Sequence, residues 1–209
     1  MKKLFWILFL AAATLAANAV QTVSAPPNAH PQPPTEYEFY WDDGIMSSGW
    51  CWYTGGGNYW AVQFDDVKTG GEPGVINLYG VYSYSSGWPD GSGQGCYMHT
   101  FGDLGGYPGG ELDRTYCPLE ISGFEWTPPE TDPLNVTTGT FYIAFEQIGS
   151  YSNCDSIYVD GAAGTHNWTG YQDSWAPTTM FGDFMLRCYW EDGLPAVEEI
   201  TWGRVKALY

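Results

Sequence analysis

The sequence predicts an all-β protein, a two-layer antiparallel β-sandwich with a jelly-roll-like arrangement in a single domain. Aromatic residues make up 18% of the chain, and 27 residues are glycine. Aromatic side chains favour strands, whereas glycine favours turns. Short aromatic or β-branched runs alternate with clusters of Gly, Pro, Asp and Ser, which is the spacing typical of antiparallel sandwiches and barrels. Nine such runs are enough for two packed sheets.

Residues 1–19 have the three zones of a secretory signal peptide. Lys2 and Lys3 supply positive charge, an apolar run follows at residues 4–17, and a small-residue cleavage site ends at Ala19. A run of 14 residues is too short to span a bilayer, which takes about 20. We therefore expect a bacterial leader that is cleaved, a mature chain without a transmembrane segment, and a location outside the cell or on its surface.

A spacer is expected at residues 20–36, because the segment PPNAHPQPP at 26–34 is rich in proline. Proline cannot join a helix interior or a central strand, and proline-rich segments are extended. The sandwich domain should then occupy residues 37–193, a size that suits one domain.

Strands are predicted where apolar or aromatic residues alternate between turn signals. In the run 140–148, Phe141 and Phe145 fall on one face, and Tyr142 and Glu146 fall on the other. The predicted strands are residues 37–41, 50–54, 59–64, 75–84, 97–101, 119–126, 140–148, 156–159 and 183–190.

Residues 194–209 break this pattern and are predicted to form a tail beyond the sandwich. The segment VEEITWGRVKALY contains Arg204 and Lys206, two of the five basic residues of the mature chain, and its apolar residues have weak helical spacing. Two alternatives remain open for the tail. It is either a terminal strand or helix packed on the domain, or a sorting or docking tag.

Several segments together resemble a group of exported bacterial β-sandwich proteins, similar to carbohydrate-binding modules, some of which carry C-terminal sorting sequences. These segments are YWDDGIMSSGWCWYTGGGNYWAVQF, GTFYIAFEQIG, SWAP, GDFMLRCYW and VEEITWGRVKALY, within residues 37–209. They are strand patterns and not catalytic signatures. The resemblance therefore implies an extracellular sandwich and no particular reaction.

The charge of the chain limits its partners. Without Lys2 and Lys3, five basic residues face 24 acidic ones, a net charge near −19. Nucleic acid and anionic membranes are therefore poor partners. Clustered carboxylates attract hard divalent cations, so we consider a structural calcium ion, although no cofactor is required and acidic turns are the alternative. The candidate ligands are Asp42, Asp43, Asp65, Asp66 and Asp90.

Five cysteines lie in the predicted mature chain, where export allows them to oxidise. Four of them could form two bridges and leave one thiol, and spacing does not fix the connectivity. Cys96 and Cys117 flank one glycine-rich excursion, so we expect a disulfide between them. Cys188 is two residues from Leu186, so the two side chains share one face of the predicted strand. Cys188 should therefore face inward, either bridged or as a buried thiol.

Enzymatic motifs are absent from the sequence. It contains neither G-x-S-x-G nor H-E-x-x-H. Glycoside hydrolysis is the serious enzymatic alternative, because it needs only two carboxylates and an aromatic cleft. Glu111-Leu112-Asp113 resembles the start of the laminarinase strand motif, but no second glutamate follows. We expect these two acids to be solvated turn residues and the protein not to be an enzyme.

Carbohydrate binding fits the composition, because flat aromatic rings stack on sugars and nearby carboxylates bind their hydroxyl groups. The interpretation is therefore a secreted or cell-surface module that recognises a polysaccharide or other glycan. The alternative is a structural or adhesive protein whose partners are other surface proteins. The candidate ligand-binding residues are Trp50, Trp52, Tyr59, Trp60, Trp88, Trp168, Tyr171 and Trp175.

Overall fold

The structure is a computed structural model of the chain. It describes residues 19–24, 38–84, 94–119, 123–131, 133–151, 153–162, 164–179 and 181–192. No helix among these residues has the length and apolar character needed to cross a membrane.

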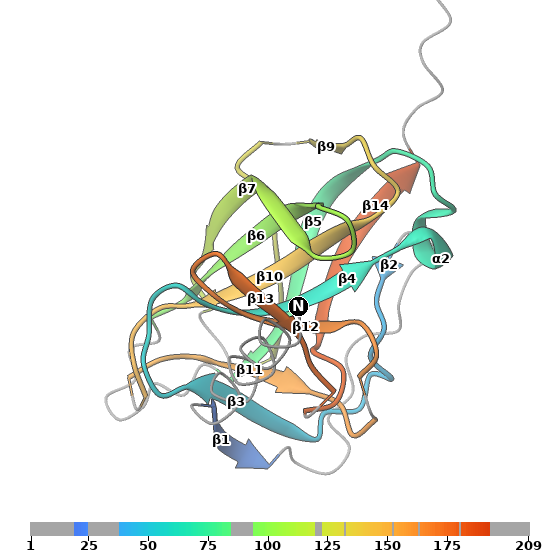
Figure 1. Cartoon of the computed structure of the whole chain (residues 1–209). Coiled ribbons are helices and arrows are strands. Elements are labelled where there is room, and N and C mark those ends of the chain that lie inside the picture. The colour runs from blue at the N-terminus through green and yellow to red at the C-terminus, as the bar shows by residue number, and fades with distance from the viewer. Residues whose placement is uncertain are drawn as a thin grey trace, which may run out of the picture.

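Two antiparallel sheets make up nearly all of the described structure (Figure 1). The first has eight strands within the described ranges, in the order β1-β3-β11-β5-β14-β2, with β8 and β9 also paired to β5. Its members are β1 (Ala19–Ser24), β2 (Glu38–Phe39), β3 (Ser48–Trp52), β5 (Gly74–Tyr84), β8 (Gly123–Thr127), β9 (Leu134–Val136), β11 (Ser156–Val159) and β14 (Leu186–Asp192).

The second sheet has six strands within the described ranges, in the order β13-β12-β4-β10-β6-β7. Sequence neighbours β6 and β7 pair as a hairpin, as do β12 and β13, whereas β10 lies between β4 and β6. Its members are β4 (Asn58–Phe64), β6 (Cys96–Asp103), β7 (Pro108–Cys117), β10 (Phe141–Gln147), β12 (Asn167–Tyr171) and β13 (Ser174–Pro177).

The hydrophobic core lies between the two sheets. Phe141 and Phe145 of β10 face Leu186 and Trp190 of β14, and all four side chains are buried. Trp190 stacks on Phe141 with 5.1 Å between ring centroids. Burial of large aromatic and aliphatic side chains is the main source of stability in such a sandwich.

The predicted fold class is confirmed: the described chain is an antiparallel β-sandwich with almost no helix. Each of the nine predicted strands overlaps an observed strand, and residues 156–159 match β11 from end to end. The helix α2 (Asp66–Thr69) is one turn, which Asp65 caps by accepting a hydrogen bond from the backbone of Val67.

Other strands are not anticipated by the pattern, namely β7, β9, β12 and β13. β7 begins Pro108-Gly109-Gly110, and several of its residues are exposed at the edge of the sheet. An edge strand with one solvated side needs little apolar alternation, so its sequence resembles that of a turn. β1 contains residues 20–24 of the predicted spacer and pairs with β3, so strand structure begins before residue 37.

Candidate functional site

The six-stranded sheet has one face on the core and one face turned away from it, which we call the outer face. Strand residues alternate between these faces. On β10, for example, Phe145 enters the core and Glu146 faces outward, and on β6 Met98 enters the core and His99 faces outward. The outer face comprises Tyr59, Ala61, Tyr97, His99, Phe101, Glu111, Arg114, Tyr116, Tyr142, Ala144, Glu146, Trp168, Gly170 and Trp175.

Aromatic rings cover the middle of the outer face. Trp175 lies over Gly170, where an added Cβ would meet the indole ring at 2.6 Å, so only glycine fits beneath it. The indole then reaches Tyr59 at 5.2 Å and Phe101 at 5.1 Å between centroids. Ala144 lies on β10, the strand between those of Tyr59 and Phe101, and it belongs to the same cluster as Trp175.

A polar cluster lies beside these rings, with His99 at its centre. The two ring nitrogens of His99 contact different carboxylates: Nδ1 is 2.8 Å from Oε2 of Glu111, and Nε2 is 2.9 Å from Oε2 of Glu146. Arg114 donates to the same oxygen of Glu146 at 3.1 Å, and the backbone N–H of Gly57 donates to its other oxygen at 3.0 Å. We call Glu111, His99, Glu146 and Arg114 the polar cluster.

A β-bulge in β7 brings Glu111 into this cluster. Thr100 lies opposite Asp113 and Phe101 lies opposite Glu111, so Leu112 is an extra residue between them. In a regular strand Glu111 and Asp113 would share a face, but the extra residue turns them to opposite faces. Glu111 therefore contacts His99, while Asp113 accepts hydrogen bonds from Tyr79 and Thr131 on the core side.

The expectation that Glu111 and Asp113 are turn residues is therefore wrong. Both lie in β7, and Asp113 is buried. Four donors compensate its buried carboxylate: the hydroxyl groups of Tyr79 and Thr115 and the backbone N–H groups of Glu130 and Thr131. Asp113 has a structural role that ties β7 to the core.

Electrostatics keep Glu146 ionised. Burial alone would raise its pKa, but the hydrogen bonds with His99 and the backbone of Gly57, together with the charge of Arg114, lower the pKa below its ordinary value. The pKa of Tyr59 moves upward, first because of burial and then because of the negative charges of Glu146 and Glu111. The outer face thus presents a fixed carboxylate among neutral phenol rings.

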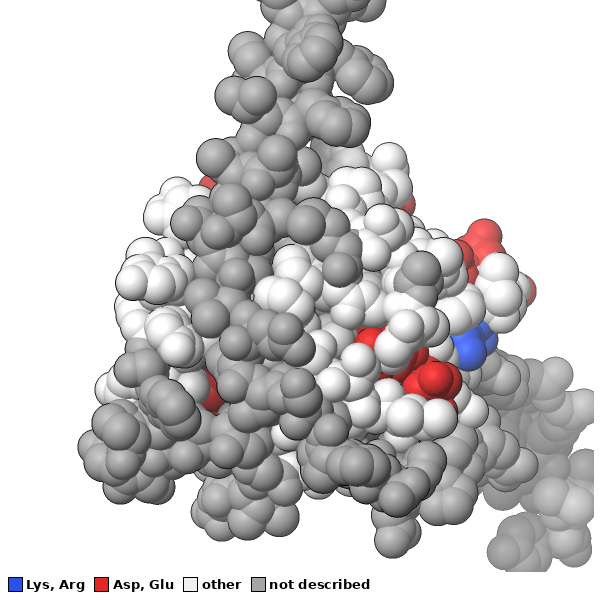
Figure 2. Space-filling model, turned by 90° about the horizontal axis from the view of Figure 1, so that it is seen from below, with Lys and Arg blue, Asp and Glu red and all other residues white. Residues whose placement is uncertain are grey.

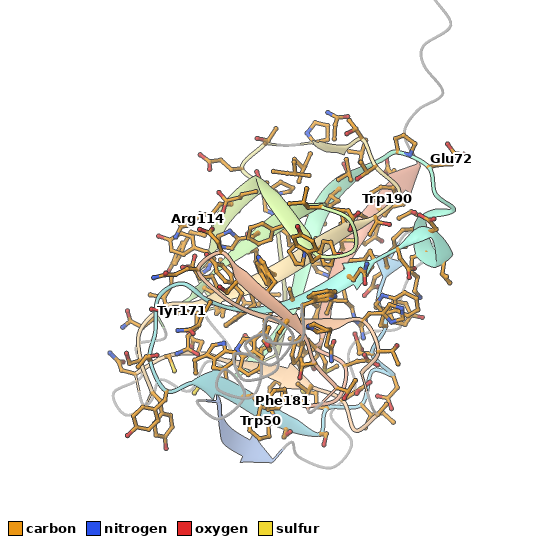
Figure 3. All side chains as sticks on the ribbon, in the orientation of Figure 1. Trp50, Glu72, Arg114, Tyr171, Phe181 and Trp190 are labelled. Carbon is orange, nitrogen blue, oxygen red and sulfur yellow. The ribbon has the colours of Figure 1, made fainter. Side chains whose placement is uncertain are left out.

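The exposed part of the outer face lies on β7 and β6. The side chains of Glu111 and Arg114 are each 46% exposed, and Tyr116 is 49% exposed. Tyr116 contacts Tyr97 edge to face at 5.7 Å, and the guanidinium of Arg114 lies 4.0 Å from the centre of the Tyr97 ring. Figure 3 shows Arg114 on the flank of the molecule formed by β7. A ligand here would meet a tyrosine ring, a guanidinium group and a carboxylate.

The structure brings together Tyr59, Trp168 and Trp175 among the predicted ligand-binding residues. All three lie on the outer face and are partly exposed. Tyr171 is exposed, but its cross-strand partner is Asn58, so it lies at the end of β12 on the opposite side of the sheet. Trp88 lies outside the described residues.

Three of the predicted ligand-binding tryptophans belong to the core instead. Trp52 and Trp60 are almost completely buried and stack on each other at 4.4 Å. Trp50 packs against the core edge to face with Phe181 at 4.7 Å, and Figure 3 shows this pair far from Arg114. The prediction was wrong for Trp52 and Trp60, because Trp52 on β3 and Trp60 on β4 meet between the two sheets, where large aromatic side chains fill the core.

Sequence reasoning considered Glu111 as a possible catalytic acid, but it did not predict that the residues of the polar cluster form a site. The alternation of residues 140–148 placed Glu146 on the face opposite Phe145, which was the available signal. His99 and Glu111 are brought to Glu146 by the pairing of β10 with β6 and of β6 with β7. Strand order is not encoded in local periodicity, so the cluster could not be assembled from the sequence.

The predicted calcium ligands do not converge. Asp42 is buried and accepts hydrogen bonds from the guanidinium of Arg187, while Asp65 caps α2. Asp43 accepts a hydrogen bond from the backbone of Ile45 in a turn, and Asp66 follows Asp65 in the first turn of α2. Asp90 lies outside the described residues. Within the described ranges no group of three or more His, Cys, Asp or Glu side chains is arranged to hold a metal ion.

The surface charge agrees with the acidic composition. On the face drawn in Figure 2, Asp and Glu are more prominent than Lys and Arg among the described residues. The polar cluster has two carboxylates and one guanidinium, beside a histidine that contacts both acids. A ligand that is itself strongly anionic would meet repulsion from most of this surface.

No known protein family matches the chain, and no curated protein matches its sequence. Among solved structures, the fold is similar to the crystal structure of the cysteine protease and lectin-like domains of Cwp84, a surface layer associated protein of Clostridium difficile. The TM-score is 0.50 and the identity is 11%, and the similarity covers 78% of this chain and 37% of that chain. At this identity the likeness concerns the fold.

Proposed function

We propose that this protein is a non-catalytic module that binds carbohydrate on the outer face of its six-stranded sheet. The observation that carries the proposal is the combination of Tyr116, Tyr97 and Arg114 with Glu111 on one exposed surface. Sugar rings stack on aromatic faces, and their hydroxyl groups hydrogen-bond with carboxylates and guanidinium groups. The rings of Tyr59 and Trp175 extend this surface across the sheet.

The polar cluster supports binding by holding its groups in place. His99 and the backbone of Gly57 hold Glu146 in place, and Glu146 in turn holds the guanidinium of Arg114. The guanidinium therefore loses little freedom when a ligand binds. Preorganised groups of this kind improve affinity by lowering the entropic cost of binding. A neutral glycan is the class that suits an acidic surface that exposes the guanidinium of Arg114.

Glycoside hydrolysis by the polar cluster is less well supported than binding. Glycosidases that use two carboxyl groups need one of them protonated as the general acid, with a raised pKa. The pKa of Glu146 is instead lowered, and its carboxylate already accepts several hydrogen bonds. We therefore propose a binding role for these acids.

We also propose that the protein acts outside the cell or at its surface, as a released or surface-attached module. The predicted leader at residues 1–19 supports export. The fold similarity to a structure that contains a lectin-like domain of a surface layer associated protein supports a surface role for this sandwich. The alternative is a structural or adhesive role with protein partners, and a glycan-binding experiment distinguishes the two roles.

A glycan array probed with the exported chain tests the proposal. The array is run once with millimolar calcium chloride and once with a chelator, which also tests whether a structural calcium ion contributes to binding. We expect binding to neutral glycans. Absence of binding in both conditions would overturn the carbohydrate proposal and favour the structural role.

Variants then locate the binding surface. Tyr116→Ala and Arg114→Met should each weaken the affinity for the best glycan by about tenfold or more, which corresponds to about 1.4 kcal/mol. Tyr53→Ala is the matched control, because Tyr53 is 60% exposed and contacts another tyrosine, Tyr151, and neither of them belongs to the outer face. Equal affinities in all three variants would place the ligand elsewhere.

A further inference from the structure

The five cysteines form two contacting pairs and one isolated residue. All five are buried, and none forms a disulfide in this structure. One pair joins the hairpin strands β6 and β7 of the six-stranded sheet, and the other joins β3 of the eight-stranded sheet to the segment before β11. The isolated residue is Cys188 on β14. The pairs are Cys96 with Cys117, and Cys51 with Cys154.

Cys96 and Cys117 lie directly opposite each other in the ladder between β6 and β7. Opposed residues of antiparallel strands have Cα atoms about 4.5 to 5.5 Å apart, which is within the range of about 4.4 to 6.8 Å that a disulfide needs. Their thiol groups are already hydrogen-bonded to each other. Bridging this pair therefore needs no rearrangement of the sheet.

Cys51 and Cys154 are in contact although about half the chain separates them. Cys51 belongs to β3, and Cys154 stands two residues before β11, which pairs with β3. Their thiol groups are hydrogen-bonded to each other. Sequence spacing gives no indication of this pair, since it depends on the order of strands in the sheet.

Cys188 has no cysteine beside it in the ladder. Its cross-strand partners are Phe39 on β2 and Tyr79 on β5. Its side chain is completely buried in the core, and this burial raises the pKa of the thiol well above its ordinary value. A buried thiol with a high pKa is unreactive.

We propose that the exported protein carries two disulfide bonds, Cys51–Cys154 and Cys96–Cys117, and retains Cys188 as a buried thiol. For each bond, a cysteine thiolate attacks the disulfide of a thiol–disulfide oxidant and forms a mixed disulfide, releasing one oxidant sulfur. The second cysteine displaces the other oxidant sulfur. One S–S bond forms in the protein, the oxidant becomes a dithiol, and the two cysteine protons end on its sulfurs.

The two thiols of each pair also affect each other's pKa. The hydrogen bond with Cys154 lowers the pKa of Cys51, and the hydrogen bond with Cys96 lowers the pKa of Cys117. The partners have raised pKa values, Cys154 mainly because of its bond with Cys51 and Cys96 mainly because of burial.

The bond between Cys96 and Cys117 would also affect the outer face. It would lie at the end of β7 and fix that edge strand to β6. β7 carries Glu111, Arg114 and Tyr116, the most exposed residues of the outer face. The bond between Cys51 and Cys154 would join β3 to the segment that leads into β11, away from the outer face.

Thiol counting by mass spectrometry tests the proposal. The protein is exported to an oxidising compartment, purified without reductant, denatured and alkylated. We expect one alkylated cysteine per chain, identified as Cys188, and five after reduction, which matches the five cysteines. A protease digest without reduction should contain linked peptides for Cys51 with Cys154 and for Cys96 with Cys117.

Single variants separate the two bonds. Cys51→Ser should add one alkylated cysteine, Cys154, and leave the bond between Cys96 and Cys117 intact. Cys117→Ser should do the same for Cys96, while Cys188→Ser should leave no alkylated cysteine and both bonds. A linked peptide that contains Cys188, or five alkylated cysteines in the exported protein, would overturn the proposal whether or not the protein binds carbohydrate.

Discussion

The backbone N–H of Asp183 donates to Oδ1 of Asp160 at 2.8 Å, so two buried aspartates lie side by side where β11 ends and β14 approaches. Asp160 satisfies both of its oxygens with backbone donors, from Asp43, Ala162 and Asp183. Oδ1 of Asp183 has no hydrogen-bond partner among the described residues. Burial first, and then the charge of Asp160, raises the pKa of Asp183 to about 6.

The first prediction concerns pH and the free energy of unfolding at Asp183. Because its pKa is raised in the folded state, from 3.8 to about 6, the folded chain binds this proton more tightly than the unfolded chain does. The protonated carboxyl of Asp183 contributes fully to the stability of the fold below about pH 4, and this contribution is lost as the pH rises through about 6. Asp183→Asn should therefore be more stable than the parent chain by roughly 2 kcal/mol at pH 8 and nearly equal to it at pH 4.

Urea unfolding at both pH values measures this difference. Asp173→Asn is the control, since Asp173 is exposed and should change the free energy of unfolding by less than about 0.5 kcal/mol at either pH. A loss of stability in Asp183→Asn at pH 8 would contradict the prediction and would mean that the buried carboxylate has a partner.

The second prediction concerns Arg187, which is 1% exposed. Its guanidinium donates to Glu38 at 2.8 Å and to Asp42, and it thereby joins β14 to β2 and the segment that follows. Arg187→Met removes the cation and leaves both carboxylates buried, so the free energy of unfolding should fall by about 3 to 5 kcal/mol. The triple variant with Glu38→Gln and Asp42→Asn should recover part of this loss. A cost below about 1 kcal/mol in Arg187→Met would contradict this account.

The third prediction concerns Gln147, whose side chain links the two sheets. Its amide nitrogen donates to the backbone carbonyls of Trp52 and Gly149, both at 2.9 Å, and its oxygen accepts from the backbone N–H of Trp52. Gln147→Glu keeps the shape but removes both donors and buries a charge. We expect it to cost roughly 2 to 4 kcal/mol in thermal or urea unfolding, and Gln147→Ala to cost a similar amount. Unchanged stability in both variants would show that Trp52 has other partners.

Strands of this fold could be predicted where their residues alternate between a face on the core and a face turned away from it. Residues 141–147 alternate between core and outer face, so their strand could be predicted with nearly correct ends. β7 could not, because Gly109 and Gly110 resemble turn residues and a bulge at Leu112 interrupts the alternation. Local pattern identifies strands that have one buried face, and it misses edge strands that depend on pairing.

The candidate site was harder to predict than the fold for the same reason. Tryptophan is a residue type that commonly stacks on sugars, but the two sheets enclose Trp52 and Trp60 in the core. His99, Glu111 and Glu146 are scattered in the sequence and meet only because β6 pairs with both β7 and β10. A site built across three strands depends on topology, which residue type and spacing do not determine.

The fourth prediction concerns Glu146, which should show a pH dependence opposite to that of Asp183. Its pKa is lowered in the folded state, so its contribution to stability is present above its unfolded pKa of 4.5 and is lost as the pH falls through the folded value. Glu146→Gln keeps the size but loses the charge that His99 and Arg114 face, and it should cost about 1 to 3 kcal/mol at pH 7. The difference from the parent chain should shrink as the pH falls through the lowered pKa of Glu146, where the parent carboxyl also becomes neutral. Urea unfolding of Glu146→Gln and Asp183→Asn across the same pH series checks both signs at once, and parallel slopes in the two variants would contradict the assignment of either carboxyl group.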